Sequence, residues 1–277
     1  MIDKPPEYKI FAIRYATRDA RRADHFVGGD PHDASMPMDY FTWVVVGPER
    51  TFLVDIGFTE EVAARRKRRF LRCPIESLKL IGVEPDAIID VIITHLHYDH
   101  VGNFHKLPNA RFHLQERELA FTTGRYMRYP YFGHGFEVED VAGMVRLNFK
   151  RRVELYDGDV ELAPGLTLHL AAGHTAGLQV VRVHTRRGNV VLASDSSHYY
   201  ENLQSNRPFP GVVNTADSID SFRKVERLAA SPRHIIPGHD PLVMLRYPAP
   251  SPSLRGVVVR LDVDPLEVDA LEADFLE

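Results

Sequence analysis

Residues 91–103 read VIITHLHYDHVGN, and the interpretation of the whole chain starts from this stretch. The run from Val91 to Ile93 is β-branched and uninterrupted by charge, which is typical of a strand covered on both faces. Side chains that can bind a metal follow directly at the expected strand end: His95, His97, Asp99 and His100. A buried core has no use for so many strongly hydrated groups, so the stretch predicts a functional site.

The spacing of these side chains indicates how they divide between ions. His95 and His97 are two residues apart, so in an extended segment they face the same side and bind one ion. Asp99 and His100 follow a bend and point towards a second ion. Imidazole combined with carboxylate suits zinc or a similar divalent transition metal, whereas an all-oxygen set would indicate calcium or magnesium.

Length and composition predict one domain spanning residues 1–277. The chain is 44% hydrophobic, which is enough to bury a large core. Residues 16–39 are predicted to be rich in loops, and the acidic segment of about residues 262–277 is interpreted as a tail or a homodimer contact. The basic run at 63–69 is expected on the solvated face of one helix. With a net charge of −4, no nucleic-acid binding is expected.

The location expected from sequence is the cytoplasm. The amino terminus lacks the basic and apolar regions of a signal peptide, and no apolar run is long enough to cross a membrane. The single cysteine, Cys73, has no partner for an internal disulfide, which fits a reducing compartment.

The stretch THLHYDH at 94–100 resembles the central motif of the metallo-β-lactamase superfamily. Four further pieces occur in the family's order: LVDIG at 53–57, AGHTAG at 172–177, ASD at 193–195 and PGHD at 237–240. The resemblance covers roughly residues 40–240. It implies an α/β fold, the four-layer αββα sandwich.

The resemblance also implies a full set of metal ligands for two divalent ions. It assigns His95, His97 and His174 to the first ion, Asp99, His100 and His239 to the second, and Asp195 as the bridge. The ions are expected to be Zn²⁺, with Mn, Fe or Co as alternatives. Asp55 and Thr175 are expected to support the ligands from behind, although a capping role in a turn remains an alternative for Asp55.

Among the branches of the superfamily, the chain is most similar to the N-acyl homoserine lactone lactonases. The implied reaction is attack on a lactone carbonyl by a hydroxide shared between two ions, with Asp99 moving the proton. Those enzymes carry a tyrosine three residues after the bridging aspartate, where this chain has His198, followed by Tyr199. Either His198 acts as the donor, or a neighbouring tyrosine reaches the ring, or the preferred substrate is a different lactone or ester.

Residues 124–136 are dense in aromatic residues and glycine, and two interpretations stay open: a segment that covers the substrate, or a packed surface loop. Its apolar content favours an acyl or aromatic substituent over a highly charged one. The residues expected in the substrate pocket are Phe104, Tyr126, Met127, Tyr129, Tyr131 and Phe132.

Other functions within the same fold remain as alternatives. A thioesterase of the glyoxalase II kind shares the ligand order, but this chain ends in an acidic tail instead of a basic glutathione-binding domain. A β-lactamase would be expected to carry an export signal. A diiron redox protein usually replaces the second histidine by glutamate, whereas this chain has His97. A non-catalytic metal-binding protein would be expected to lack part of the ligand set.

Overall fold

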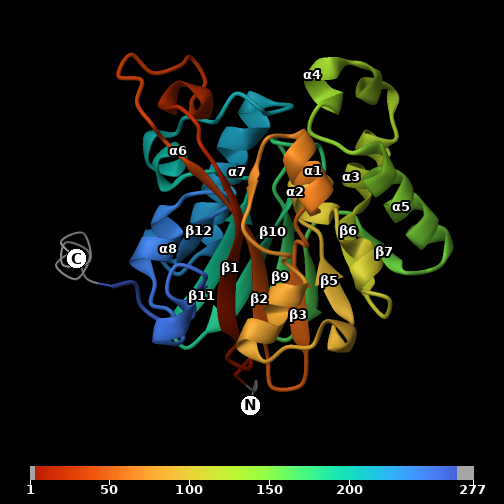
Figure 1. Cartoon of the computed structure of the whole chain (residues 1–277), viewed down its shortest axis with the longest axis vertical. Helices are drawn as coiled ribbons and strands as arrows, with labels where there is room; N and C mark the ends of the chain where they lie inside the picture. The colour runs from red at the N-terminus through yellow and green to blue at the C-terminus, as the bar shows by residue number, and fades with distance from the viewer. Residues whose placement is uncertain (1–3, 267–277) are drawn as a thin grey trace.

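Two β-sheets packed face to face form the centre of the molecule, and helices cover both outer faces (Figure 1). The computed structural model describes residues 4–266. Across the first sheet the strands are β13 (Val258–Arg260), β1 (Lys9–Arg18), β2 (Met38–Val46), β3 (Thr51–Val54), β5 (Asp90–Ile92), β6 (Arg111–Gln115) and β7 (Val153–Tyr156). Strand β4 (Arg69–Phe70) pairs with β1 beside this path. Across the second sheet they are β12 (Ile235–Pro237), β11 (Gly188–Ser194), β10 (Gln179–Thr185), β9 (Leu166–Leu170) and β8 (Val160–Ala163).

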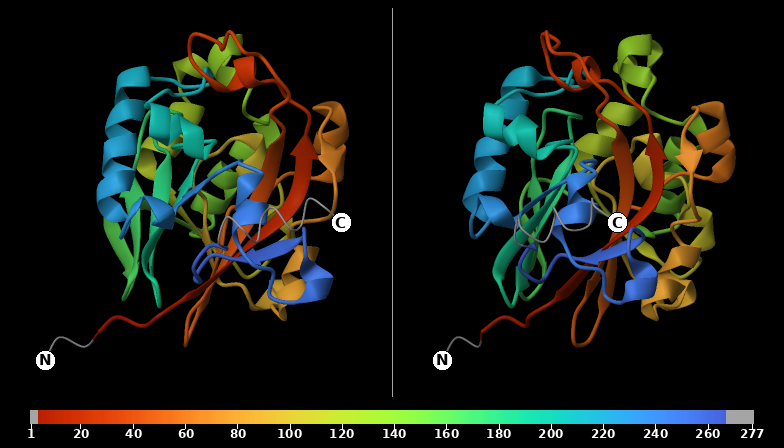
Figure 2. Two further views of the ribbon diagram at one scale, coloured as in Figure 1. Left: turned by 90° about the vertical axis from the view of Figure 1, so that its left-hand side faces the viewer. Right: turned by 60° about the vertical axis from the view of Figure 1, so that its left-hand side comes forward.

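The helices lie outside the sheets, as the two rotated views show (Figure 2). The α-helices are α1 (Glu60–Arg65), α2 (Tyr98–Val101), α3 (Glu116–Thr122), α4 (Pro130–Gly133), α5 (Val138–Phe149), α6 (Tyr200–Ser205), α7 (Thr215–Leu228) and α8 (Leu242–Arg246). Short 3₁₀ turns span Arg22–His25, Glu76–Ile81, Pro85–Ala87, Phe104–Lys106, Arg125–Arg128, Pro232–His234 and Pro252–Leu254.

Three layers of apolar side chains hold this arrangement together. Trp43 and its neighbours fill the space between the two sheets. A second cluster, which includes Val91 and Met144, lies between the first sheet and its helices, and a third joins Phe222 of α7 to the second sheet. Helix, sheet, sheet and helix therefore follow one another, and the predicted αββα sandwich is confirmed.

The strand predicted from the apolar run forms as β5 and is buried on both faces. Val91 and Ile93 pack towards the helices, whereas Ile92 packs between the sheets. Strands β2 and β3 form a hairpin in antiparallel register. Because β3, β5 and β6 run parallel, the segments that follow them leave the sheet at the same edge.

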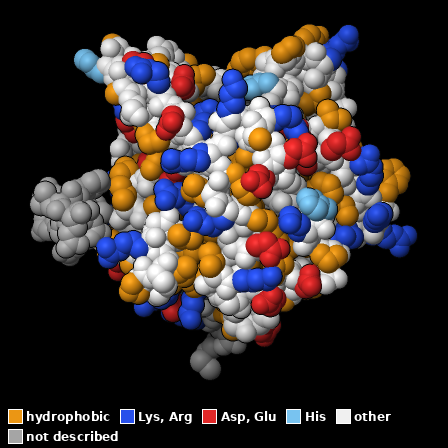
Figure 3. Space-filling view, in the orientation of Figure 1, with side chains coloured by type: hydrophobic (Ala, Val, Ile, Leu, Met, Phe, Trp, Pro, Cys, Tyr) orange, Lys and Arg blue, Asp and Glu red, His pale blue; other side chains and the backbone are white. Residues whose placement is uncertain are grey.

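The predicted course of the basic run at 63–69 is wrong. Helix α1 ends at Arg65, because Lys67 adopts a left-handed conformation with φ of 55° and the Arg68 N–H donates to the carbonyl of Ala63. The chain then returns as β4. Arg65 and Arg66 form ion pairs with Glu137 at 2.6 and 2.7 Å, so the run is not simply solvated. Over the face in Figure 3, basic and acidic side chains are interspersed.

No helix within residues 4–266 has the length and apolar character needed to cross a membrane. Of the predicted acidic tail at about 262–277, the structure describes residues 262–266, where Asp262 is buried and paired with Arg260; the rest lies outside the described residues.

Candidate functional site

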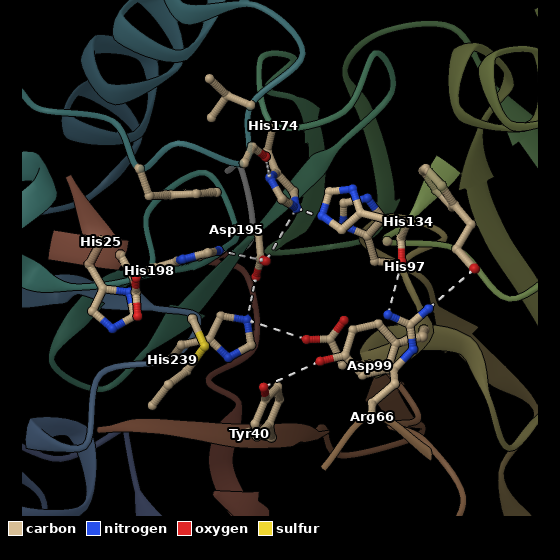
Figure 4. A pocket seen from close by; sticks show the side chains of 18 of the residues that line it. His25, Tyr40, Arg66, His97, Asp99, His134, His174, Asp195, His198 and His239 are labelled. Atoms are coloured by element: carbon tan, nitrogen blue, oxygen red, sulfur yellow. Dashed lines mark hydrogen bonds and ion pairs between the residues drawn. The ribbon is translucent and has the colours of Figure 1, made fainter. Parts of the chain in front are cut away.

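Seven side chains from four strand ends meet at one edge of the sandwich, and Figure 4 shows most of them around one cavity. His95 and His97 follow β5, and the short helix α2 carries Asp99 and His100. The remaining members follow strands of the second sheet: His174 after β9, Asp195 after β11 and His239 after β12. The structure thus brings together all seven residues that the resemblance implied as ligands.

The first triad is formed by His95, His97 and His174. The Nε2 atom of His95 lies 3.0 Å from Nδ1 of His97, and Nε2 of His174 lies 3.2 and 2.8 Å from these two atoms. Ligands on one tetrahedral zinc ion, with Zn–N bonds of about 2.0–2.1 Å, stand roughly 3.3 Å apart. Burial lowers the pKa of all three imidazoles, so they are neutral and present lone pairs to a cation.

The second triad is formed by Asp99, His100 and His239. One oxygen of Asp99, Oδ2, lies 3.7 Å from Nε2 of each histidine. Burial alone would lower the pKa of His100, but the carboxylates of Asp55, Asp99 and Asp195 outweigh it and raise this pKa to about 10. Three carboxylates thus act on His100, and in the absence of a metal ion a proton on this imidazole offsets part of their charge, as a bound cation would.

Asp195 lies between the two triads and presents a different oxygen to each. Oδ2 lies 3.3 Å from Nε2 of His174, whereas Oδ1 lies 3.0 Å from Nε2 of His239. Oδ1 and the Nε2 atom of His100 are buried without a hydrogen-bond partner, although they are only 3.5 Å apart. Unsatisfied buried atoms of this kind fit a pair of cations held between the triads.

Outer contacts fix the orientation of most of these imidazoles. The pairs are His95 Nδ1 with Thr94 Oγ1 (3.2 Å), His100 Nδ1 with Asp55 Oδ2 (2.6 Å), His174 Nδ1 with Gly211 O (2.7 Å) and His239 Nδ1 with Asp39 O (2.8 Å). Because a backbone carbonyl only accepts, Nδ1 of His174 and His239 must carry the proton, which leaves Nε2 free to bind.

Asp55 has the supporting position that the sequence suggested. Besides its contact with His100, its carboxylate accepts hydrogen bonds from the backbone N–H and the hydroxyl of Thr94, both at 2.8 Å. Asp55 adopts a left-handed conformation with φ of 56°, and Ser194, just before Asp195, does so with φ of 44°. Strained residues thus stand at two of the strand ends that carry the site.

Glu118 supports the ligands as well, and the sequence did not reveal it. This buried carboxylate of α3 accepts from the backbone N–H groups of Leu96 (2.9 Å) and Gly177 (3.0 Å). Thr175, expected behind the ligands, donates its hydroxyl to Glu118 at 2.6 Å and touches no imidazole through that hydroxyl. Glu118 therefore joins the segment between His95 and His97 to the turn after His174. In the sequence it is one acidic residue of a short helix.

Gly135 packs directly against the imidazole ring of His97. A Cβ built on Gly135 would lie 2.5 Å from Nε2 of His97. The ring of Phe136 packs against the same imidazole with centroids 4.4 Å apart. The imidazole has little room to move aside, so only glycine fits at position 135.

Gly135→Ala is expected to weaken metal binding at the first triad by about 10–100-fold, the range found when groups behind a ligand are altered. Competition with a chromophoric chelator measures this affinity. Gly211→Ala is the matched control, because an added Cβ there meets only Phe209 at an ordinary 3.7 Å. Equal affinities for the two variants would show that the Gly135 contact does not hold His97.

His198 lies beside the seven residues, and its imidazole contacts Asp195. Nε2 lies 3.0 Å from Asp195 Oδ2, and the ring stacks on Phe209 with centroids 3.3 Å apart. Burial lowers the pKa of His198, so the imidazole is neutral and donates its Nε2–H to Asp195. Nδ1 is buried with no hydrogen-bond partner.

The expectation that Tyr199 acts at the lactone ring does not fit the geometry. Tyr199 is 2% exposed and does not line the cavity. Its hydroxyl lies 3.0 Å from Nε2 of His25 and 3.1 Å from the carbonyl of Pro37. The chain direction after Asp195 turns His198 inwards and places the following tyrosine behind the site, where it packs against the loop before β2.

A cavity of about 210 Å³ opens above the seven side chains. Of the six residues expected to line it, only Tyr131 and Phe132 do so. Phe104 instead packs against Gly143 of α5. Tyr126 packs against Phe121 and borders a separate hollow. Met127 and Tyr129 do not border the cavity. Most aromatic rings of the segment therefore serve its own packing, which composition alone could not distinguish from a pocket wall.

Tyr131 nevertheless connects the two sides of the cavity. Its hydroxyl donates to the carbonyls of Pro210 and Val212, each at 3.1 Å. The segment at 124–136 thus covers part of the cavity and is also a packed loop, so both interpretations of the sequence apply to it.

Comparison with known proteins gives one family. A family model described as the metallo-beta-lactamase superfamily matches residues 37–239. The N-acyl homoserine lactonase AiiA of Bacillus thuringiensis subsp. kurstaki is 30% identical over 170 residues, which cover 60% of this chain and 61% of that protein. A crystal structure of a quorum-quenching N-acyl homoserine lactone lactonase superposes with a TM-score of 0.73 at 22% identity, covering 87% of this chain and 95% of the other. AidC, a dizinc quorum-quenching lactonase, superposes with a TM-score of 0.63 at 19% identity over 86% and 89%.

Proposed function

The chain belongs to the metallo-beta-lactamase superfamily, and from this membership and the geometry of the cavity we propose that it is a metal-dependent hydrolase that opens lactone rings. The observation that carries the proposal is Asp195, whose two oxygens face two separate triads. Similar proteins named as N-acyl homoserine lactonases support lactones as the substrate class. The match to AiiA spans less than two thirds of that protein, so the activity is proposed for this chain and not transferred to it.

We assign two divalent ions, zinc in the first place, to the two triads. His95, His97 and His174 would hold one ion, and Asp99, His100 and His239 the other, with Asp195 shared. A similar fold described as dizinc supports this number and metal. When bound, such ions lower the pKa of water from 15.7 towards about 7 and polarise a carbonyl oxygen.

The protein's own groups would align the substrate and exclude water. The hydrogen bond from His198 fixes Asp195, so His198 is a positioning residue and not the donor to the ring. Asp99 borders the cavity on the side of the second triad, and we assign to it the transfer of a proton to the departing alkoxide. Tyr131, bonded across to Pro210 and Val212, limits access from solvent.

The cavity favours a compact substrate. Its volume of about 210 Å³ lies below the roughly 300–1,000 Å³ of common ligand pockets. A lactone ring with a short substituent fits this space better than a long acyl chain does. We therefore place short-chain N-acyl homoserine lactones and small γ-lactones first among the substrates.

A substrate panel tests the proposal. The metal-loaded protein is expected to open butanoyl homoserine lactone or a simple γ-lactone, with lower kcat/KM for the decanoyl homologue. S-lactoylglutathione is the competing thioester. Turnover of the thioester alone would replace the lactonase assignment by a thioesterase, and no turnover of any ester by protein loaded with two ions would favour a non-catalytic role.

A further inference from the structure

The cavity is lined by basic as well as aromatic residues. Its aromatic members include Phe132, Phe136 and Phe209. Arg18, Arg66 and Arg68 also line it, close to Tyr40 and Tyr98. A neutral substrate gives no reason for three cationic groups in a small cavity, so each arginine has to be accounted for.

Arg66 is fully committed to the protein. Its Nε pairs with Glu137 at 2.7 Å, and its Nη atoms donate to the carbonyls of His134 (2.9 Å) and Phe136 (3.3 Å). Figure 4 shows this side chain turned towards the carbonyl groups of the covering segment. Arg66 therefore holds that segment in place, and the charge of Glu137 neutralises its own.

Arg18 and Arg68 are different, because within residues 4–266 neither forms an ion pair with a carboxylate. Arg68 donates Nε to the hydroxyl of Tyr98 (3.0 Å) and Nη1 to the carbonyl of Arg66 (2.7 Å), both neutral acceptors. The Nε atom of Arg18 is buried without a hydrogen-bond partner. Both side chains thus hold positive charge in the cavity wall without a carboxylate in direct contact among residues 4–266.

The fold places these two charges next to each other. Thr17 of β1 pairs with Arg69 of β4 in antiparallel register, so Arg18 and Arg68 follow this pair on neighbouring chain segments. Burial raises the pKa of Tyr40, and both arginines oppose that rise, which puts both within electrostatic reach of one hydroxyl. Like charges on neighbouring segments repel, and an anion between them would remove the repulsion.

The acidic groups on this side do not serve as that anion. Asp24 borders the cavity, but its carboxylate accepts from the backbone N–H of Arg21 at 3.2 Å and caps the 3₁₀ turn at 22–25. Asp99 faces His100 and His239, and its negative charge helps to raise the pKa of Arg68 without a direct ion pair. Neither carboxylate pairs with Arg18 or Arg68 among the described residues.

We propose that Arg18 and Arg68 bind a carboxylate on the substrate, so that the preferred substrate is a small lactone or ester with an anionic substituent. The inference rests on the proposed function and specifies its substrate class. Two guanidinium groups offer the forked donors that match a carboxylate, and a partly buried setting strengthens the contact. The reacting carbonyl would then lie over Asp195, with the carboxylate on the side of Tyr40 and Tyr98. Composition predicted that a charged substituent would be disfavoured. That prediction relied on aromatic residues of the segment at 124–136, most of which lie outside the cavity.

A matched substrate pair tests the inference. The pair is 5-oxotetrahydrofuran-2-carboxylate and its primary carboxamide, which have the same γ-lactone ring and differ in charge. For the metal-loaded protein, kcat/KM is expected to be at least about 10-fold higher for the carboxylate. In Arg18→Gln/Arg68→Gln, turnover of the carboxylate should fall about 10–100-fold, while turnover of the carboxamide changes less than about 3-fold.

The matched control variant is Lys67→Gln/Arg69→Gln. It removes the same two charges from exposed neighbours and should keep the substrate preference. Thermal unfolding and metal content of each variant check that the fold and the metal centre are retained. Equal kcat/KM for both lactones in the unmodified protein, or a preference that persists in the Arg18/Arg68 variant, would overturn the inference.

A binding measurement separates this inference from the proposed function. Calorimetry with 5-oxoproline and its carboxamide, lactams that report binding without ring opening, should give at least about 10-fold tighter binding of the carboxylate. That difference should disappear in the Arg18/Arg68 variant. If no lactone is opened but this difference is found, the proposed function fails and the carboxylate site stands. If lactones are opened and the lactams bind equally, the carboxylate site fails alone.

Discussion

Asp195→Ala is expected to lower kcat/KM for lactone opening by about 10³-fold or more and to reduce bound metal below two ions per chain. The substitution removes both oxygens that face the two triads, at 3.3 Å from His174 and 3.0 Å from His239. Lewis-acid stabilisation by such a centre contributes several kcal/mol, and about 4 kcal/mol corresponds to 10³-fold in rate. Steady-state kinetics with elemental analysis of the same sample measures both effects.

The control for Asp195→Ala is Asp220→Ala, which removes an exposed carboxylate of α7 and should leave both quantities unchanged. Asp195→Asn adds a finer comparison, because one oxygen is kept and the charge is lost. An Asp195→Ala protein with full activity and two ions per chain would rule out the bridging role.

Asp55→Ala is expected to destabilise the fold by about 3–5 kcal/mol, the typical cost of breaking a buried charged contact. Asp55 is fully buried, and its loss would leave the backbone N–H of Thr94 and Nδ1 of His100 without their acceptor. Chemical denaturation of the metal-free protein measures the change in unfolding free energy without a contribution from bound ions.

Metal binding gives a second readout for the same residue. Asp55→Asn keeps the shape but places an amide against His100, so affinity at the second triad should fall about 10–100-fold. Asp86→Ala, at an exposed position in a 3₁₀ turn, is the control for both measurements. If the unfolding free energy of Asp55→Ala falls by less than about 1 kcal/mol and the metal affinity of Asp55→Asn is unchanged, Asp55 does not support the site and is an ordinary turn residue.

Those parts of the fold that depend on local pattern could be predicted from sequence. The apolar run before His95 predicted β5, which forms as Asp90–Ile92. Helix α5 was not anticipated, because Glu137 forms no side-chain cap and Gly143 weakens the helical pattern. The early end of α1 depends on a left-handed lysine where glycine would be expected.

The seven residues of the candidate metal site could be predicted because each lies in a recognisable motif shortly after a strand. The cavity walls could not be predicted, since they depend on pairs that are distant in sequence. Arg68 reaches the cavity only because β4 pairs with β1, and Glu118 acquires its role only where α3 meets the turn after His174. Tyr199 stood next to the expected catalytic position, but the backbone turns its side chain away.

Anomalous diffraction from crystals of the zinc-loaded protein would locate the two proposed ions on either side of Asp195. Two anomalous peaks are predicted, one among His95, His97 and His174 beside Oδ2, the other among Asp99, His100 and His239 beside Oδ1. A single peak, or peaks that do not share Asp195, would rule out a dinuclear centre bridged by this carboxylate.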